Sequence, residues 1–554
     1  MEIQLTNPVI IQSDRSILLE VHNPLFEQAR DALSRFSELV KSPEHIHTYR
    51  ITPLSLWNAA SSGSGEKEIL SQLHEFSKYP VPQNIIIDIK EILNRYGKIR
   101  LFPDGKKDLL KLEVTDEYLF KELKYNRKLQ DYWVEEIPEG FLINIKNRGN
   151  IKQSLIKIGY PVEDRVGYID GSPLEIRLKP YTGNGEPFSL RDYQKDSIST
   201  FYRDGTIEGG HGVITLPCGS GKTIIGMGIM EKISSYTLII STNTVAVHQW
   251  IDELLDKTTL TPDLIGEYTG HIKEIRPVTI ATYQILTYRK SKESDFTHME
   301  LFRQKNWGLI IYDEVHTLPA PVFRATADIQ SKRRLGLTAT LVREDGLEDD
   351  VFSLVGPKKY DMPWKELENK KFIAQAYCYE IRLDLPHKEK LSYAVADGRN
   401  KFRIASENSS KLKIAEEIME NHRDEQILII GQYISQLEYL QKNLNLPMIT
   451  GKMKNSEREK LYHDFREGKI NTLIVSKVAN FAIDLPDASV AIQVSGTFGS
   501  RQEEAQRLGR ILRPKNRPSY FYTLVSRDTK EQDFALNRQM FLAEQGYKYR
   551  IENW

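Results

Sequence analysis

Short apolar runs alternate with helical stretches from about residue 186 to the end of the 554-residue chain. A first set of expected strands covers 211–216, 236–241, 278–281, 308–312 and 335–337, and a second set covers 427–430, 448–450, 472–475, 490–494 and 520–525. Such alternation is typical of parallel, doubly wound sheets. The sequence therefore predicts two α/β domains in tandem, joined by segment 357–372, in which no strand is expected.

The residues before this region show a different pattern, which predicts two small α+β domains. Apolar stretches within 8–21 predict a hairpin, and a helix is expected at 25–40. Helices at 66–76 and 84–96 followed by a strand at 98–102 are compatible with a winged-helix arrangement, although many small α+β modules share this order. The expected domains are 1–110, 111–185, 186–360 and 361–554, with the turn-rich segment 181–187 as the clearest boundary.

The composition excludes some classes of protein. With only two cysteines, and apolar runs far shorter than the roughly 20 residues that cross a bilayer, neither a disulfide scaffold nor a transmembrane helix is expected. The N-terminus lacks the features of a secretory signal, so a reducing, cytoplasmic location is expected. The 76 basic and 76 acidic side chains cancel, but residues 501–517 hold six basic and two acidic ones. The overall balance therefore does not exclude a nucleic-acid partner.

A glycine-rich segment between an expected strand and an expected helix has the pattern of a phosphate-binding loop. Backbone amides of the loop and the N-terminal end of the helix would face an anion. Lys222 would neutralise the β and γ phosphates of ATP, and the Thr223 hydroxyl would hold Mg²⁺. Leu216 stands where the first glycine is usual, and the alternative is an ordinary glycine-rich turn. The candidate nucleotide-binding residues are Leu216, Pro217, Cys218, Gly219, Ser220, Gly221, Lys222 and Thr223.

An acidic pair follows the expected strand 308–312, at the C-terminal edge of the first sheet. Asp313 would hold the magnesium through water, and Glu314 would orient and deprotonate the attacking water. An isolated acidic pair is more often a solvated surface feature. Its place directly after a strand and downstream of the glycine-rich loop favours a role in ATP hydrolysis.

Three arginines at intervals of three residues, Arg507, Arg510 and Arg513, share one face of an expected helix in the second α/β domain. Arg510 and Arg513 would reach across a cleft to the γ phosphate when the two domains close. The state of the nucleotide would then control domain closure, which is the property of a motor. The alternative is an exposed basic helix.

The loop, the acidic pair and the arginine helix together resemble superfamily 2 helicases, whose fold is two tandem RecA-like parallel-sheet motor domains. The resemblance implies that Arg191 and Gln194 belong to the adenine-reading segment. It implies that His316 couples ATP to DNA contacts, with a purely structural histidine as the alternative. It also implies coupling roles for Thr338, Thr340, Gln506 and Asp484, and DNA contacts for Gln249, Trp250, Thr282 and Ser476. Core packing is the alternative for Trp250.

The resemblance narrows to the XPB-type DNA repair helicases, and to their bacterial members. Residues 335–342 run directly into Arg343, Glu344 and Asp345, which match the RED triplet of that family and are expected to contact DNA. Arg343 either stacks on a base at a duplex fork or pairs with the acidic residues beside it. Segments 159–161 and 175–180 are similar to the end of the family's damage-recognition domain. Only 386–401 is available for the family's thumb-like insertion, so a thumb would be short.

Membership of this family implies an enzyme that uses ATP and Mg²⁺ to move 3′ to 5′ on DNA and open duplexes, in nucleotide excision repair or a related process. The expected partners are single-stranded DNA, forked or damaged duplex DNA, and a nuclease, whose docking face no residue identifies. A nucleoid-associated location would follow. The first alternative is a duplex translocase or strand-annealing remodeller that does not unwind. The second is a damage-binding scaffold in which ATP serves only as a clamp.

Overall fold

The structure is a computed structural model that describes residues 4–43, 45–106, 108–217, 219–289, 296–330, 332–341, 346–476, 488–498, 500–512, 515 and 517–554. Six of the candidate residues lie outside this part of the chain: Cys218, Arg343, Glu344, Asp345, Asp484 and Arg513. Among the helices of the described residues, none combines the length and the apolar character that a membrane crossing needs.

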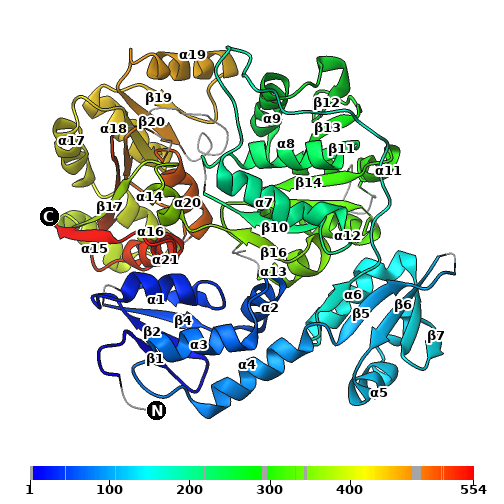
Figure 1. Cartoon of the computed structure of the whole chain (residues 1–554). Coiled ribbons are helices and arrows are strands. Elements are labelled where there is room, and N and C mark those ends of the chain that lie inside the picture. Colours follow the sequence, from blue (N-terminus) through cyan, green and yellow to red (C-terminus); the bar gives the residue numbers. More distant parts are fainter. Residues whose placement is uncertain are drawn as a thin grey trace.

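A four-stranded antiparallel sheet and four helices form the N-terminal module (Figure 1). The strand order is β1-β2-β4-β3, and the pairing of β1 with β2 confirms the expected hairpin. The helix expected at 25–40 is shorter, because the chain after α1 forms β3, whose backbone groups pair with β4. The elements are β1 Val9–Ile11, β2 Ser16–Glu20, α1 Phe26–Leu33, β3 Glu38–Lys41, β4 Ile46–Arg50, α2 Pro53–Ser61, α3 Glu66–Phe76 and α4 Gln83–Arg95.

A five-stranded sheet of order β7-β8-β6-β5-β9 forms the second module. The domain boundary expected at residue 110 is wrong, because β5 lies before it and pairs with both β6 and β9. The strand expected to complete a winged-helix arrangement in the first module therefore belongs to the second. The elements are β5 Ile99–Pro103, β6 Leu109–Val114, α5 Glu117–Tyr125, β7 Trp133–Ile137, β8 Gly140–Asn144, α6 Arg148–Lys157 and β9 Val162–Asp164.

The first motor domain is a seven-stranded parallel sheet of order β12-β13-β11-β14-β15-β10-β16. All five expected strands are present. The segment expected to join the motor domains without a strand instead contributes β16, which pairs with β10 at the sheet edge. The elements are α7 Asp192–Tyr202, β10 His211–Thr215, α8 Lys222–Ile233, β11 Thr237–Ser241, α9 Thr244–Lys257, β12 Ile265–Tyr268, β13 Val278–Thr282, α10 Tyr283–Leu286, α11 Leu301–Gln304, β14 Leu309–Asp313, α12 Ala320–Asp328, β15 Arg333–Thr338, α13 Glu348–Asp350 and β16 Lys358–Asp361.

The second motor domain repeats this plan with the strand order β19-β20-β18-β21-β22-β17-β23, again with all pairs parallel. The segment expected to hold a short thumb forms two helices, α15 and α16. The elements are α14 Trp364–Asn369, β17 Ala376–Leu383, α15 His387–Val395, α16 Gly398–Ser406, α17 Lys411–Asn421, β18 Ile427–Gly431, α18 Ile434–Leu444, β19 Met448–Ile449, α19 Asn455–Arg466, β20 Thr472–Ser476, β21 Val490–Gln493, α20 Arg501–Gly509, β22 Ser519–Ser526, α21 Lys530–Glu544 and β23 Tyr549–Asn553. The expected class, two tandem RecA-like domains behind small α+β modules, is confirmed.

The N-terminal module contacts both motor domains, as Figure 1 shows. On the first, the side-chain oxygen of Asn58 accepts a hydrogen bond of 3.0 Å from the backbone amide of Lys358. On the second, Met540 and Ala543 of α21 are part of the module's apolar core. A change in the separation of the two motor domains must therefore alter at least one of these contacts.

His47, at the contact between the N-terminal module and the second motor domain, predicts a loss of stability in acid. Burial, and then the charges of Arg30 and Lys548, lower the pKa of His47 from 6.5 to about 4. Because the folded state disfavours the protonated ring, the stability that neutral His47 contributes is complete above pH 6.5 and is lost as pH falls towards 4. Between pH 7 and pH 5 this amounts to about 2 kcal/mol.

The measurement is the thermal unfolding midpoint at pH 7 and pH 5. We expect the His47→Gln variant to lose less stability than the wild type over this interval. The His74→Gln variant, in the same module, should behave like the wild type. An equal loss in the His47→Gln variant would remove His47 as the source of the acid sensitivity.

Candidate active site

The glycine-rich segment forms a tight loop between β10 and α8. Gly219 and Gly221 adopt φ values of 78° and 83°, which favour glycine. A Cβ atom at Gly221 would lie 2.7 Å from the side-chain amide nitrogen of Gln194, so a side chain there would displace that amide. The loop ends where α8 begins, at Lys222. This geometry presents the helix N-terminus and the Lys222 ammonium to an anion.

Lys222 and Glu314 come together across the sheet edge. The ammonium lies 3.9 Å from one Glu314 carboxylate oxygen, and it donates to the backbone oxygens of Leu216 and Pro217 at 3.3 and 3.4 Å. Both side chains are largely buried, with 11% and 19% of their surfaces exposed. The two groups that the sequence assigns to the phosphate and to the attacking water are thus neighbours.

Residues of the expected adenine-reading segment support the loop from behind. Gln194 is buried, accepts a hydrogen bond from the Arg191 amide at 2.9 Å and donates one to the backbone oxygen of Ser220 at 3.2 Å. The Tyr193 hydroxyl donates to the same oxygen at 2.5 Å. The Arg191 guanidinium lies 5.1 Å from the centre of the Phe372 ring, in the segment that leads to the second motor domain. Tyr193 is a contributor that the sequence reasoning missed.

Asp313 ends β14 and is held by two donors. Its Oδ2 atom accepts hydrogen bonds of 3.0 Å from the Ser241 hydroxyl and from the Trp250 indole. Ser241 was not foreseen, although it ends the neighbouring strand β11, whose Ile240 is in register with Tyr312. Burial, and then the nearby Glu314 carboxylate, raise the pKa of Asp313. A cation at this site would favour the ionised carboxylate.

Glu314 adopts a left-handed backbone conformation, with φ of 50°, which is uncommon for a residue with a side chain. Its Oε2 atom lies 3.4 Å from His316 Nδ1. His316 Nδ1 is also 2.6 Å from the Thr338 hydroxyl, which donates to the backbone oxygen of Thr340 at 2.6 Å. Because the Thr338 proton is used in that bond, His316 Nδ1 must be the donor to Thr338. A continuous chain thus joins the acidic pair to the candidate coupling residues.

The Trp250 side chain belongs to the core and does not lie on a DNA-facing surface. It is 2% exposed, and a Cβ atom at Gly226 of α8 would lie 2.6 Å from its ring. The candidates Thr282 and Ser476 are buried too, Thr282 as the cap that accepts from the Ile285 amide. In this arrangement none of these three side chains is accessible to DNA, because each closes a strand end or packs on a helix. Gln249, one residue before Trp250, is exposed on α9.

The indole–carboxylate bond predicts a specific effect of the Trp250→Phe substitution. Phenylalanine fills most of the space but leaves Asp313 with one donor fewer, so we expect a loss of about 1–3 kcal/mol of stability and a higher Mg²⁺ requirement for ATP turnover. The matched control is Trp307→Phe, since the buried Trp307 indole donates to the Leu301 oxygen at 2.9 Å in the same domain. The control should lose stability without a change in the Mg²⁺ midpoint. If the Trp250→Phe and Trp307→Phe variants had the same Mg²⁺ midpoint for ATP turnover, the role of the Trp250 indole in holding Asp313 would be refuted.

Helix α20 ends at Gly509, so it carries Arg507 but not Arg510, and it is anchored by a buried charged network. Glu504 is fully buried, lies 3.4 Å from Arg538 and accepts from Gln493 at 2.9 Å and from the Tyr549 hydroxyl at 3.1 Å. Arg507 is 2% exposed and donates to Gln493. The alternative of an exposed basic helix is therefore wrong at Arg507, which packs inside the domain. Gln506 is half-buried on the same helix, and Arg510, also half-buried, is the C-cap residue that follows it.

The donor set fits a nucleotide with magnesium. The loop amides and Lys222 suit phosphate oxygens, while the Thr223 hydroxyl and the Asp313 carboxylate are hard oxygen ligands of the kind that Mg²⁺ takes with water and phosphate. Asp313 is held by Ser241 and Trp250 in a fixed orientation, as a metal-holding carboxylate requires. The fold and this site together define a two-domain, RecA-like nucleotide-driven motor.

Three family models match the chain. One described as ERCC3/RAD25/XPB C-terminal helicase matches residues 367–553, one described as type III restriction enzyme, res subunit, matches 187–343, and one described as helicase conserved C-terminal domain matches 9–138. The first two models correspond to the two motor domains, and the third lies over the N-terminal modules.

Relatives align over nearly the whole chain. The DNA 3′-5′ helicase XPB of Kineococcus radiotolerans is 51% identical, covering 98% of this chain and 96% of the relative. The protein of the same name from Mycobacterium tuberculosis is 49% identical over 99% and 98%. The general transcription and DNA repair factor IIH helicase/translocase subunit XPB/SSL2 of Saccharomyces cerevisiae is 31% identical over 98% and 71%. The chain belongs to the XPB family of DNA helicases.

Proposed function

We propose that this protein is an ATP-dependent DNA helicase that moves 3′ to 5′ and acts in DNA repair, with nucleotide excision repair as the specific process. The observation that carries the proposal is the juxtaposition of Lys222 and Glu314 at 3.9 Å, with Glu314 linked through His316 to Thr338 and Thr340. The name of the bacterial relatives, DNA 3′-5′ helicase, supports the polarity and the substrate.

In this proposal each group of the first motor domain has one task. Lys222 and the loop amides bind the β and γ phosphates, and Thr223 and Asp313 hold Mg²⁺, which supplies charge neutralisation at the phosphates when it is bound. Glu314 accepts the proton of the attacking water. Gln194, with Arg191, reads the adenine from its place behind the loop.

The second motor domain supplies charge in trans. Arg510, and Arg513 with it, approach the γ phosphate when the domains close, and the buried Glu504–Arg538 pair keeps α20 in position for that movement. The chain from Glu314 to Thr340 communicates the nucleotide state to the rest of the motor, with Gln506 and Asp484 as coupling residues of the second domain. The RED triplet Arg343, Glu344 and Asp345 contacts DNA at the fork, and Gln249 contacts the DNA backbone. We also infer a nuclease partner and a nucleoid-associated, cytoplasmic location.

A second candidate function is translocation on duplex DNA without strand separation. The name of the yeast relative, helicase/translocase subunit, favours this second function. DNA-stimulated ATP turnover together with release of a labelled strand from a forked duplex tests both functions. Turnover with release supports the helicase, turnover without release supports the translocase, and turnover that DNA does not stimulate overturns both.

A further inference from the structure

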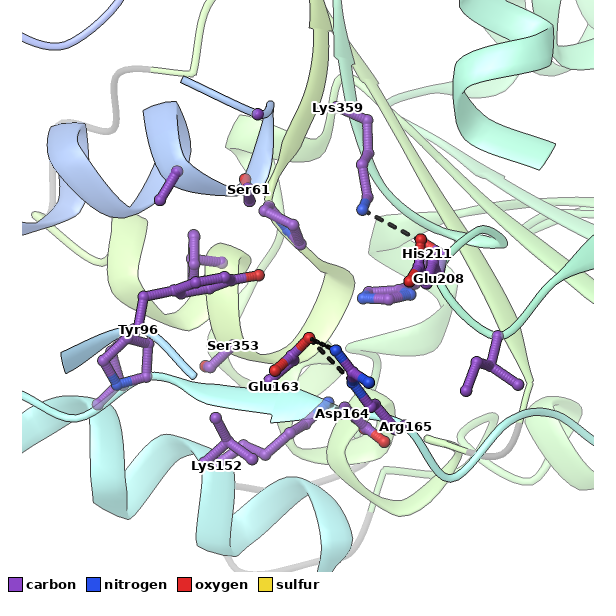
Figure 2. Close-up of a pocket in the computed structure, with 18 of the residues that line it drawn as sticks. Ser61, Tyr96, Lys152, Glu163, Asp164, Arg165, Glu208, His211, Ser353 and Lys359 are labelled. Carbon is purple, nitrogen blue, oxygen red and sulfur yellow. Dashed lines mark hydrogen bonds and ion pairs between the residues drawn. The ribbon is translucent and has the colours of Figure 1, made fainter. Parts of the chain in front are cut away.

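A cavity of about 270 Å³ lies where the N-terminal module, the second module and the first motor domain meet (Figure 2). Its lining includes Tyr96 from the first, Glu163 and Arg165 from the second, and Arg203 and Lys359 from the motor domain. His211, which also lines it, is the first residue of β10, whereas the phosphate loop follows the last residue of that strand. The cavity is therefore at the opposite edge of the sheet from the ATP site.

The carboxylates at this cavity already have cationic partners. Asp164 contacts Arg148 at 2.8 Å and Lys152 at 3.0 Å. Glu163 contacts Arg165 at 2.6 Å and Arg100 at 3.1 Å, and Glu208 contacts Arg203 at 2.8 Å.

Lys359 also lines the cavity, and it differs from the cationic side chains that pair with these carboxylates. Its ammonium donates to the backbone oxygen of Glu208 at 3.2 Å, and within the part of the chain that the structure describes it makes no ion pair. These ion pairs and Lys359 together hold six cationic side chains against three carboxylates, an excess of three charges; two of the six, Arg100 and Arg148, stand behind the carboxylates and do not line the cavity. Since burial lowers the pKa of Lys152 to about 7, the excess is still two when Lys152 is neutral.

The Lys359 ammonium and the Tyr96 hydroxyl both line this cavity. Figure 2 shows the Lys359 side chain ending beside Glu208 and His211, with the Tyr96 ring and the Glu163–Arg165 pair on other sides of the same cavity. Burial, and then the charge of Arg203, lower the pKa of Lys359 to about 8, and an anion beside the ammonium would reverse that effect. Burial also raises the pKa of Tyr96 to about 12, so its hydroxyl remains a donor at neutral pH.

We propose that this cavity binds a phosphate group, either of a small polyphosphate or of the DNA backbone, through Lys359, Arg203, Arg165 and the Tyr96 hydroxyl. The 270 Å³ volume suits an anion of pyrophosphate size and is below that of most sites for drug-sized ligands. Because the donors come from three modules, a bound phosphate group joins the two N-terminal modules to the motor. The proposal does not depend on the ATPase function, since it uses none of the residues of that site.

The first arm of the test uses inorganic pyrophosphate in isothermal titration calorimetry at pH 7 and constant ionic strength. The full-length Lys222→Ala variant serves as the background, because it weakens the phosphate loop as a competing site. We expect it to retain a saturable site, and the added Lys359→Met substitution to weaken that site about 10–100-fold. Lys359→Arg should retain the site, and Lys195→Met, on the exposed face of α7, should leave it unchanged.

The second arm measures binding of a blunt duplex without nucleotide as salt is raised. If the phosphate belongs to DNA, Lys359→Met weakens duplex binding and lowers the slope of log affinity against log salt by about one, while pyrophosphate binding is absent. A response to Lys359→Met in either arm, with Lys359→Arg active and the thermal midpoint preserved, supports the proposal and identifies the source. Equal binding by Lys359→Met and its background in both arms overturns it.

Discussion

The Glu314→Gln variant is expected to hydrolyse ATP about 10²–10⁴ times more slowly than the wild type, with little change in ATP affinity. Glutamine keeps the size of the side chain and its place beside Lys222, but it cannot accept the proton of the attacking water. The left-handed backbone at Glu314 aims the side chain at the phosphate loop, and glutamine leaves that backbone unchanged. The loss should therefore appear in kcat and spare KM.

Single-turnover and steady-state ATP hydrolysis, with and without single-stranded DNA, measure this effect. The matched control is Glu300→Gln, which removes an exposed carboxylate from the same domain and should turn over like the wild type. Wild-type kcat in the Glu314→Gln variant would exclude Glu314 as the general base.

The second large effect concerns Arg510. We expect the Arg510→Ala substitution to lower DNA-stimulated kcat by a factor of about 10³ or more. Arg510 lies at the C-terminal end of α20 in the second motor domain, so ATP binding by the first domain should persist. The Arg510→Lys variant should recover little activity, because lysine lacks the planar, forked donors of arginine. This pattern separates a group that acts on the γ phosphate from one that only holds the fold.

The matched control for Arg510 is Arg527→Ala. Arg527 forms an exposed ion pair with Asp384 at 2.8 Å in the same domain, and such pairs contribute little to stability. The control should retain wild-type turnover. If Arg510→Ala keeps full DNA-stimulated activity, or if it loses activity only together with its thermal midpoint, the assignment fails.

The central strands were predictable because burial on both faces makes them continuous apolar runs, as in Leu309–Asp313 and Ile427–Gly431. The missed strands lie at or near sheet edges and carry mixed side chains. Strand β16, with the sequence KKYD, has no apolar run at all, and only its pairing with β10 makes it a strand. The truncated helix α1 has the same cause, since pairing of β3 with β4 outweighs local helical periodicity.

The candidate site was predictable where chemistry follows directly from chain order. Lys222 begins the helix after one strand, Asp313 ends another strand and Glu314 follows it. Because the C-terminal ends of parallel strands lie at the same edge of a sheet, these side chains are expected to lie close together. The partners of Asp313 were not predictable in the same way. Ser241 and Trp250 reach it only because β11 is the strand next to β14, an adjacency that the order of strands along the chain does not reveal.

Strand displacement on tailed duplexes tests the central claim most directly. With ATP and Mg²⁺, we expect the protein to release the labelled strand from a duplex with a 3′ single-stranded tail, not from one with a 5′ tail, and the Glu314→Gln variant to release neither. Release that requires the 5′ tail, or release from the 3′-tailed duplex that is equally fast without ATP, would contradict an ATP-driven helicase of 3′ to 5′ polarity.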